Sequence, residues 1–283
     1  MRLTTIATEN GTSAARISNG TVVALPYPDV VALLGDAAWR TGASSSGAEY
    51  GDASALEYNL PVVRPGKTFC VGLNYRAHVM ESRTRRELPE YPTLFAKFPD
   101  SLTGATSPIC LPRASEAVDW EAELGVVIGA PARRVSADRA LDYVAGLTAA
   151  NDVSMRDWQR RTSEWLQGKN FEASTPVGPV LATLDEFDDP LDLAISCDVD
   201  GQTMQQARTS DMLFSIAEIV SYASMFTTLR PGDLIVTGTP SGVASARDDQ
   251  PYVKDGQVVT VTIEGIGSCR NQFYAEGQAP GRY

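Results

Sequence analysis

Short apolar runs broken by proline and glycine dominate the chain after residue 60. They are rich in Val, Ile, Leu and Thr, and the clearest lie at 68–73, 124–128, 193–199, 233–236 and 257–264. Runs of this length bounded by turn residues are typical of buried or half-buried β-strands. The pattern therefore predicts a protein built mainly on β-sheet.

Helix-like segments interrupt these runs at 137–144, 154–164 and 210–225. In the last segment the apolar residues recur at helical spacing, which predicts a helix that packs by one face: Met212, Leu213, Ile216, Ile219 and Val220. The helices do not alternate regularly with the strands, which argues against a doubly wound parallel sheet. We expect an α+β fold around a curved mixed or antiparallel sheet.

The N-terminal part of the chain has a different pattern of apolar and turn residues. Two Asn-Gly pairs stand between short β-like runs, at Asn10-Gly11 and Asn19-Gly20, and such pairs are typical of hairpin turns. A short helix over 29–38 and a linker of small residues over 41–47 are expected to follow. We therefore predict a small N-terminal domain and linker over 1–60 and a main domain over 61–283.

Charge and composition narrow the classes of partner. The chain of 283 residues carries a net charge of −11, with a pI of about 4.6, which argues against binding to nucleic acid or to an anionic membrane. A small anionic substrate remains possible, but its site must be made locally positive. No apolar run approaches the roughly 18–20 residues of a membrane span, and the N-terminus lacks the apolar core of a signal peptide.

The cysteines indicate a reducing compartment. Cys70, Cys110, Cys197 and Cys269 are far apart and form no Cys-x-x-Cys pair. We interpret them as reduced thiols of a cytoplasmic protein, and their spacing argues against a thiolate zinc site.

Three acids at alternate positions open one of the apolar runs, in Asp119-Trp120-Glu121-Ala122-Glu123-Leu124. On a strand, alternate side chains share one face, so the charges of Asp119, Glu121 and Glu123 would crowd together beside a buried element. Burial of unpaired carboxylates costs several kcal/mol. The segment is therefore either a cation site or the solvated acidic face of an edge strand.

Asp152 offers a further carboxylate, directly before the second helix-like segment. It could be the N-cap of that helix or another metal ligand. Three carboxylates from two elements would make a hard oxygen site of the kind that suits Mg²⁺ or Mn²⁺.

Basic and amide side chains follow within the next turns. Arg156 and Gln159, three apart on the expected helix, could bind a substrate carboxylate, although a surface ion pair of Arg156 with an aspartate is the simpler alternative. Lys169 stands in a loop between two turns, where it would be either a substrate contact or an ordinary exposed lysine.

His78 is the only histidine in the chain, and Glu81 follows it by three residues. If the chemistry needs a base at neutral pH, His78 is the leading candidate and Glu81 could orient it; a surface His–Glu pair is the alternative. The charge-dense residues 82–87 then suit a mobile lid. A further turn around Thr239 could bind a carboxylate through its hydroxyl and amide groups.

Taken together, these motifs resemble the fumarylacetoacetate hydrolase family. The resemblance covers roughly residues 61–273, and its motifs run in this order: Gly72-Leu73-Asn74-Tyr75 with His78 and Glu81, Asp119-Trp120-Glu121-Ala122-Glu123-Leu124, Asn151-Asp152 with Arg156, Asp157 and Gln159, Gly168-Lys169, Pro176 with Gly178-Pro179, Pro231-Gly232-Asp233, and Thr237-Gly238-Thr239-Pro240 with Gly242-Val243. Asn170 stands where the family more often has serine, and the N-terminal residues match loosely.

The resemblance implies a mixed β-sandwich roll, a catalytic domain over 61–283 and a homodimer. It implies Mg²⁺ or Mn²⁺, with Ca²⁺ as an occasional substitute in crystals, on a ligand set that omits Asp119: Glu121, Glu123 and Asp152. It further implies a His78–Glu81 dyad, with catalytic or substrate-binding positions at Lys169, Arg156, Gln159, Thr239 and Tyr75.

The function that the resemblance implies is metal-dependent hydrolysis of the C–C bond of an acylpyruvate-type 1,3-diketo acid, such as fumarylpyruvate or acetylpyruvate, in the catabolism of aromatic or sugar acids. Oxaloacetate decarboxylation, and isomerisation or hydrolysis of a 2-oxo dienoate, are alternatives because they share an enolate. A non-catalytic protein that binds metal and oxo acids is a further alternative. Arg83, Arg85 and Arg86 in the expected lid are either readers of a second carboxylate or solvated charges.

Overall fold

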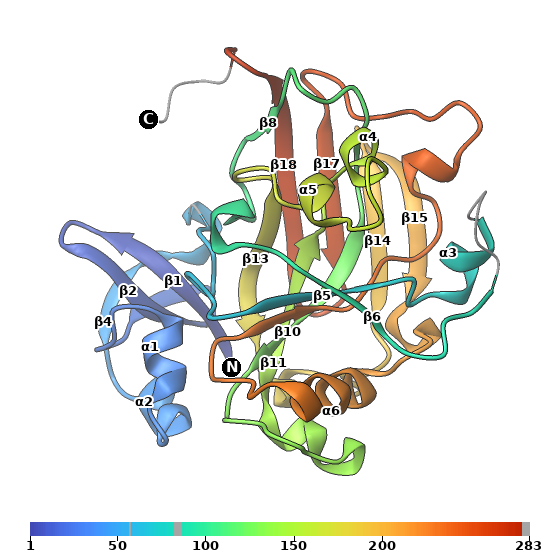
Figure 1. The fold of residues 1–283 in the computed structure, drawn as a ribbon. Helices are drawn as coiled ribbons and strands as arrows, with labels where there is room; N and C mark the ends of the chain where they lie inside the picture. The colour runs from blue at the N-terminus through green and yellow to red at the C-terminus, as the bar shows by residue number, and fades with distance from the viewer. Residues whose placement is uncertain (57, 82–86, 279–283) are drawn as a thin grey trace.

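The computed structural model describes residues 1–56, 58–81 and 87–278, and Figure 1 shows two sheets packed face to face, with helices at the edges. Within these residues the larger sheet has eleven strands. Ten follow one path: β4 (Ala48–Asp52), β3 (Thr21–Ala24), β2 (Gly11–Ser18), β1 (Arg2–Thr8), β13 (Thr175–Ala182), β11 (Val144–Asn151), β10 (Ala122–Ile128), β16 (Leu234–Val236), β5 (Thr68–Gly72) and β6 (Thr93–Ala96). The eleventh, β7 (Leu102–Gly104), pairs with β13.

The second sheet has five strands in the described part of the chain, and it packs on β10, β11 and β13. Its order is β15 (Gln202–Arg208), β14 (Ala194–Val199), β17 (Val258–Ile263), β18 (Gly267–Ala275) and β8 (Ile109–Leu111). A two-stranded ladder joins β9 (Val118–Asp119) to β12 (Ser154–Met155). Parallel and antiparallel pairs occur together, so the expected α+β fold with mixed sheets is confirmed.

Strand β10 is buried along its whole length because both of its faces are covered. Leu124, Val126 and Ile128 belong to the core between the two sheets, whereas Val127 belongs to a second core beneath the N-terminal helices. Alternation along a strand sends neighbouring side chains to opposite faces. Glu123 shares the face of Val127, so the acids at the start of β10 point away from the core between the sheets.

Both expected N-terminal hairpins form, but only the second turns at its Asn-Gly pair. Ser18 pairs with Thr21 around a two-residue turn in which Asn19 and Gly20 have φ of 50° and 80°, as a type I′ turn requires. In the first hairpin Thr8 pairs with Gly11, so that turn lies one residue earlier than its Asn-Gly pair. Strand β1 also pairs with β13, which makes the N-terminal strands part of the larger sheet.

The helices are shorter than the sequence predicts. They are α1 (Val30–Gly35), α2 (Trp39–Ser44), α3 (Arg76–Glu81), α4 (Arg156–Gln159), α5 (Leu166–Lys169) and α6 (Ile216–Phe226). Short 3₁₀ segments are η1 (Ala53–Ala55), η2 (Pro99–Ser101), η3 (Ala137–Tyr143), η4 (Leu184–Glu186), η5 (Thr209–Asp211) and η6 (Ala244–Ala246). No helix in the described ranges is long and apolar enough to cross a membrane.

Two local predictions are wrong for identifiable reasons. The expected linker over 41–47 is partly helical, because Trp39 and Ala43, one turn apart in α2, both insert into the N-terminal core. The expected helix over 154–164 stops at Gln159, where the backbone of α5 crosses so closely that a Cβ on Gly168 would lie 2.4 Å from the Gln159 nitrogen.

Candidate active site

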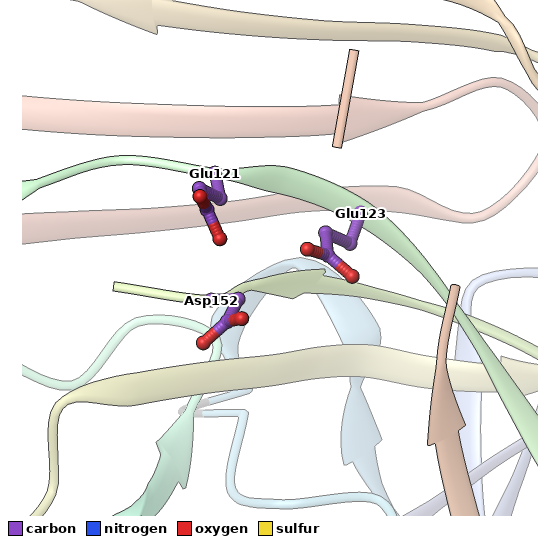
Figure 2. Close-up of side chains that lie close together, drawn as sticks. All are labelled: Glu121, Glu123 and Asp152. Atoms are coloured by element: carbon purple, nitrogen blue, oxygen red, sulfur yellow. The ribbon is translucent and has the colours of Figure 1, made fainter. Parts of the chain in front are cut away.

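Three carboxylates converge where β10 begins and β11 ends. The two strands are antiparallel, with Ala122 opposite Asn151, so Glu121 and Glu123 lie beside Asp152. One oxygen of each acid lies within 4.8 Å of the others, and all three residues are buried. Figure 2 shows the three side chains pointing into the same space. The alternative of a solvated acidic edge is therefore wrong, and so is the alternative of Asp152 as a helix N-cap, because α4 begins at Arg156 with Met155 at its N-cap.

Asp119 faces elsewhere because the strand is interrupted at Trp120 and Glu121, between β9 and β10. Its carboxylate accepts hydrogen bonds from the backbone amides of Ala244 (2.8 Å) and Ser245 (3.0 Å), and from Arg156 Nε (2.7 Å). Asp119 thus joins the loop after β16 to the arginine of the site.

Two buried lysines neutralise part of the acidic cluster. Lys169 Nζ donates to Glu121 and, at 2.7 Å, to Asp152 Oδ2. Lys97 Nζ lies 2.8 Å from Asp152 Oδ1 and donates to Thr175 Oγ1 at 2.7 Å and to the carbonyl of Lys169. Sequence reasoning missed Lys97. It is a single lysine inside the apolar stretch Leu94-Phe95-Ala96-Lys97-Phe98, which does not by itself distinguish a buried lysine from an exposed one.

The Arg156 guanidinium is also engaged by side chains of the site. Its Nη2 lies 2.7 Å from Glu121 Oε1, and its Nη1 donates to Gln159 Oε1 at 3.0 Å. The aspartate of a supposed surface pair, Asp157, instead accepts from Ser115 at 2.6 Å. The Arg156 guanidinium therefore braces the acids and Gln159 from one side.

The close packing of these buried charged groups shifts their pKa values. Burial raises the pKa of Glu121, but Arg156 and Lys169 outweigh it and lower this pKa to about 2. Burial, followed by the negative charges of Asp152 and Glu121, raises the pKa of Glu123 well above its ordinary value. Burial lowers the pKa of Lys169, but the neighbouring acids outweigh it and raise this pKa. The crowding of Glu121, Glu123 and Asp152, which raises the pKa of Glu123, and the hard oxygen ligands that these residues offer fit a divalent cation.

His78 and Glu81 lie on one face of α3 beside the acids. His78 Nδ1 is 2.7 Å from Glu81 Oε1, while Glu81 Oε2 accepts the Gly242 amide at 2.8 Å. The charge of His78 also helps to lower the pKa of Glu121, which reflects their proximity.

A cavity of about 560 Å³ joins these groups. The predicted site residues that line it are His78, Glu81, Glu121, Glu123, Arg156, Gln159, Lys169 and Thr239. Asp152 lies behind them in the acidic cluster. The structure therefore brings all but one of the predicted residues to one place.

Tyr75 is the residue that the structure does not bring to the cavity. It is 1% exposed, does not line the cavity, and its hydroxyl has no hydrogen-bond partner in the described part of the chain. Burial, followed by the charge of Glu123, raises its pKa. A substrate contact by Tyr75 stays a prediction.

Thr239 is fixed by a residue that sequence reasoning missed. Gln205 on β15 donates to Thr239 Oγ1 at 2.8 Å and accepts from the Ala122 amide at 2.9 Å, which ties the turn to the acidic strand. The turn also needs Gly238, which has a φ of 101° and whose amide donates to Glu123 at 2.6 Å. A Cβ there would lie 2.7 Å from the Asn74 Cβ.

Arg83, Arg85 and Arg86 of the expected lid lie outside the described residues.

A mixed two-sheet fold, a buried carboxylate cluster and an imidazole–carboxylate pair around one cavity define an enzyme-like site for a small polar ligand. The model of the fumarylacetoacetate (FAA) hydrolase C-terminal family matches residues 67–274, and the chain belongs to this family. Enzymes of this family generally depend on a divalent metal, and Glu121, Glu123 and Asp152 form an acidic cluster that could hold one.

Relatives and solved structures agree with this assignment. The chain is 43% identical over 220 residues to the mitochondrial oxaloacetate tautomerase Fahd2a of Rattus norvegicus, covering 77% of this chain and 70% of that protein. The fumarylacetoacetate hydrolase of Exiguobacterium antarcticum is 29% identical, with a TM-score of 0.86 over 98% of this chain and 100% of that one. A 5-carboxymethyl-2-hydroxymuconate delta-isomerase from Mycobacterium smegmatis is 34% identical, with a TM-score of 0.80 over the same shares.

Proposed function

We propose that this protein moves a proton between carbon and oxygen of an enolisable 2-oxo acid, and that it acts as an oxaloacetate tautomerase. The observation that carries the proposal is the His78–Glu81 pair, which faces a buried carboxylate cluster across one cavity. The similarity to an oxaloacetate tautomerase supports the choice of substrate.

The keto and enol forms of oxaloacetate differ in the place of one proton, on C3 or on the oxygen of C2. Because Nδ1 of His78 is engaged by Glu81, Nε2 is the ring nitrogen left to exchange that proton. The Glu81 carboxylate stabilises the imidazolium that forms, and the Gly242 amide keeps Glu81 in place.

Negative charge develops on the C2 oxygen while the proton is in transfer. Mg²⁺ or Mn²⁺ held by Glu121, Glu123 and Asp152 would supply a Lewis acid for that charge. Lys169 contributes as a fixed cation, since its neighbouring acids raise its pKa and keep it protonated. It is therefore suited to stabilising charge rather than to accepting the proton.

Hydrolysis of an acylpyruvate is the second candidate, and the same dyad favours it. His78 would then take a proton from water, which attacks the distal carbonyl carbon. The bond from that carbon to C3 breaks, and C3 takes up a proton to give pyruvate and a carboxylic acid. Decarboxylation of oxaloacetate and isomerisation of a 2-oxo dienoate need the same charge stabilisation without this attack. Homodimerisation and a cytoplasmic location stay predictions.

The test begins with the purified chain loaded with Mg²⁺ or Mn²⁺ and supplied with the enol form of oxaloacetate. Loss of enol absorbance reports tautomerisation, and proton NMR separates it from pyruvate formed by decarboxylation. Acetylpyruvate and fumarylpyruvate are assayed in parallel. We expect faster ketonisation than in buffer and a loss of about 10²–10⁴-fold in His78→Ala. Acceleration of none of these reactions would show the proposed function to be wrong.

A further inference from the structure

Among the described residues that line the cavity, one arginine has no carboxylate partner. Arg160 lines the cavity together with Thr162 and Ser163, on the segment that joins α4 to α5. Its side chain is exposed, and within residues 1–56, 58–81 and 87–278 no acid forms an ion pair with it. Figure 1 shows α4 and α5 close together.

The other basic side chains among the described residues that line the cavity are already engaged by carboxylates. Arg156 contacts Asp119 and Glu121, and Lys169 contacts Glu121 and Asp152, so the charges of both are balanced within the protein. His78 is engaged by Glu81. Because the whole chain carries a net charge of −11, an anionic group far from the acidic cluster needs a local cation, and Arg160 supplies one.

The neighbouring arginine differs from Arg160 in a way that provides a control. The Arg161 guanidinium lies 3.6 Å from the centre of the Trp158 ring, and Arg161 does not line the cavity. The two arginines share charge, size and sequence context, but only Arg160 faces the ligand space.

We propose that Arg160 binds a second carboxylate of the substrate and thereby selects 2-oxo dicarboxylates over 2-oxo monocarboxylates. The inference rests on the proposed function and specifies its substrate class. A guanidinium offers two parallel N–H donors to a carboxylate, which suits it to this contact. The Ser163 hydroxyl, which also lines the cavity, adds a donor for a remaining lone pair, whereas the Thr162 hydroxyl already donates to the Glu164 carbonyl at 3.0 Å.

The kinetic test compares Arg160→Gln with Arg161→Gln on the enol of oxaloacetate and on its C4 methyl ester, which lacks the second charge. In Arg160→Gln we expect the KM for oxaloacetate to rise about 10- to 100-fold with little change in kcat, because a hydrogen bond to a charged group is lost. The KM for the ester should stay as in the wild type. Arg160→Lys should recover part of the loss, and Arg161→Gln should behave as the wild type. An equal loss on both substrates, or no loss, would overturn the inference.

A binding measurement keeps this inference separate from the proposed function. Calorimetry in the presence of Mn²⁺ compares oxalate, which has no distal carboxylate, with 2-oxoglutarate, which has one. We expect Arg160→Gln to weaken binding of 2-oxoglutarate about 10-fold or more and to leave oxalate unchanged. If the wild type turns over no substrate, the proposed function fails while this measurement still decides the part of Arg160. Equal binding of 2-oxoglutarate by the wild type and Arg160→Gln would refute it.

Discussion

Glu81 connects His78 to the loop after β16: one carboxylate oxygen lies 2.7 Å from His78 Nδ1, and the other accepts the Gly242 amide at 2.8 Å. The imidazole is thereby held in one orientation against the cavity. Replacing Glu81 with Gln leaves the size of the side chain but removes the negative charge that stabilises an imidazolium. We expect kcat to fall at least about 10²-fold, with a smaller change in KM.

Steady-state kinetics on the most active substrate measures this effect, with Glu90→Gln as a control on an exposed residue of the same type. A rate unchanged in Glu81→Gln would mean that the dyad does not move the proton. Circular dichroism of both variants checks that the fold is retained.

The acidic cluster predicts a metal dependence that can be measured without turnover. Glu123→Gln removes one carboxylate ligand and should weaken Mn²⁺ binding at least about 10-fold. Asp157→Asn is the control, because the Asp157 carboxylate lies outside the cluster and accepts a hydrogen bond from Ser115. This variant should bind Mn²⁺ as the wild type does. Electron paramagnetic resonance counts free Mn²⁺ in such titrations. Chelation should abolish activity, and added Mg²⁺ or Mn²⁺ should restore it. Equal Mn²⁺ affinity in Glu123→Gln and the wild type would place the ion elsewhere.

Lys97→Met should lower the stability of the fold, because Lys97 is one of two buried lysines that pair with Asp152. Its side chain is 0% exposed, and it spans Asp152, Thr175 and the carbonyl of Lys169. Lys97→Met leaves part of the Asp152 charge uncompensated and should reduce the free energy of unfolding by about 3–5 kcal/mol. Urea unfolding in the absence of metal measures the loss, with the exposed Lys254→Met as the control.

A second mutation tests the cause of this loss. Asp152→Asn in the Lys97→Met background removes the charge left behind, so the double variant should be less destabilised than the sum of the two single variants. Simple additivity would show that Lys97 stabilises the fold by packing rather than through Asp152.

The convergence of the three acids could be expected from the sequence because their pattern is local, whereas the omission of Asp119 from the ligand set came only from the family resemblance. Glu121 and Glu123 alternate before an apolar strand, and Asp152 ends the next long apolar run, so antiparallel pairing brings them together. Lys97 could not be recognised in this way, since nothing in a lone lysine of an apolar stretch tells whether it reaches solvent or a buried acid 55 positions away in the chain. Contacts of that kind depend on sheet order.

The extent of α4 was unpredictable for a similar reason. Residues 154–164 favour a helix locally, but the close approach of Gly168 to Gln159 ends the helix after a single turn. Arg160, the residue that follows this crossing, lines the cavity. Propensity and periodicity carry no information about such crossings.

The capping box at the N-terminus of α6, away from the site, should make a pH-dependent contribution to the free energy of unfolding. Ser215 Oγ accepts the Glu218 amide at 3.3 Å, and Glu218 Oε2 accepts the Ser215 amide at 2.8 Å, which forms a capping box. The Ser215 hydroxyl and then its amide lower the pKa of Glu218. Glu218→Ala should therefore cost roughly 1 kcal/mol of unfolding free energy at pH 7.

The sign of the pH dependence follows from that lowered pKa. A carboxyl whose pKa is lower in the folded state stabilises the fold fully above its unfolded pKa of about 4.3, and this contribution is lost as the pH falls through the folded value. The difference between the wild type and Glu218→Ala should therefore be constant from pH 7 to about pH 5 and should narrow below it. Urea unfolding at each pH measures the difference, and Glu172→Ala, on an exposed residue, is the control. A difference that widens on acidification would show that the charge of Glu218 does not stabilise the helix terminus.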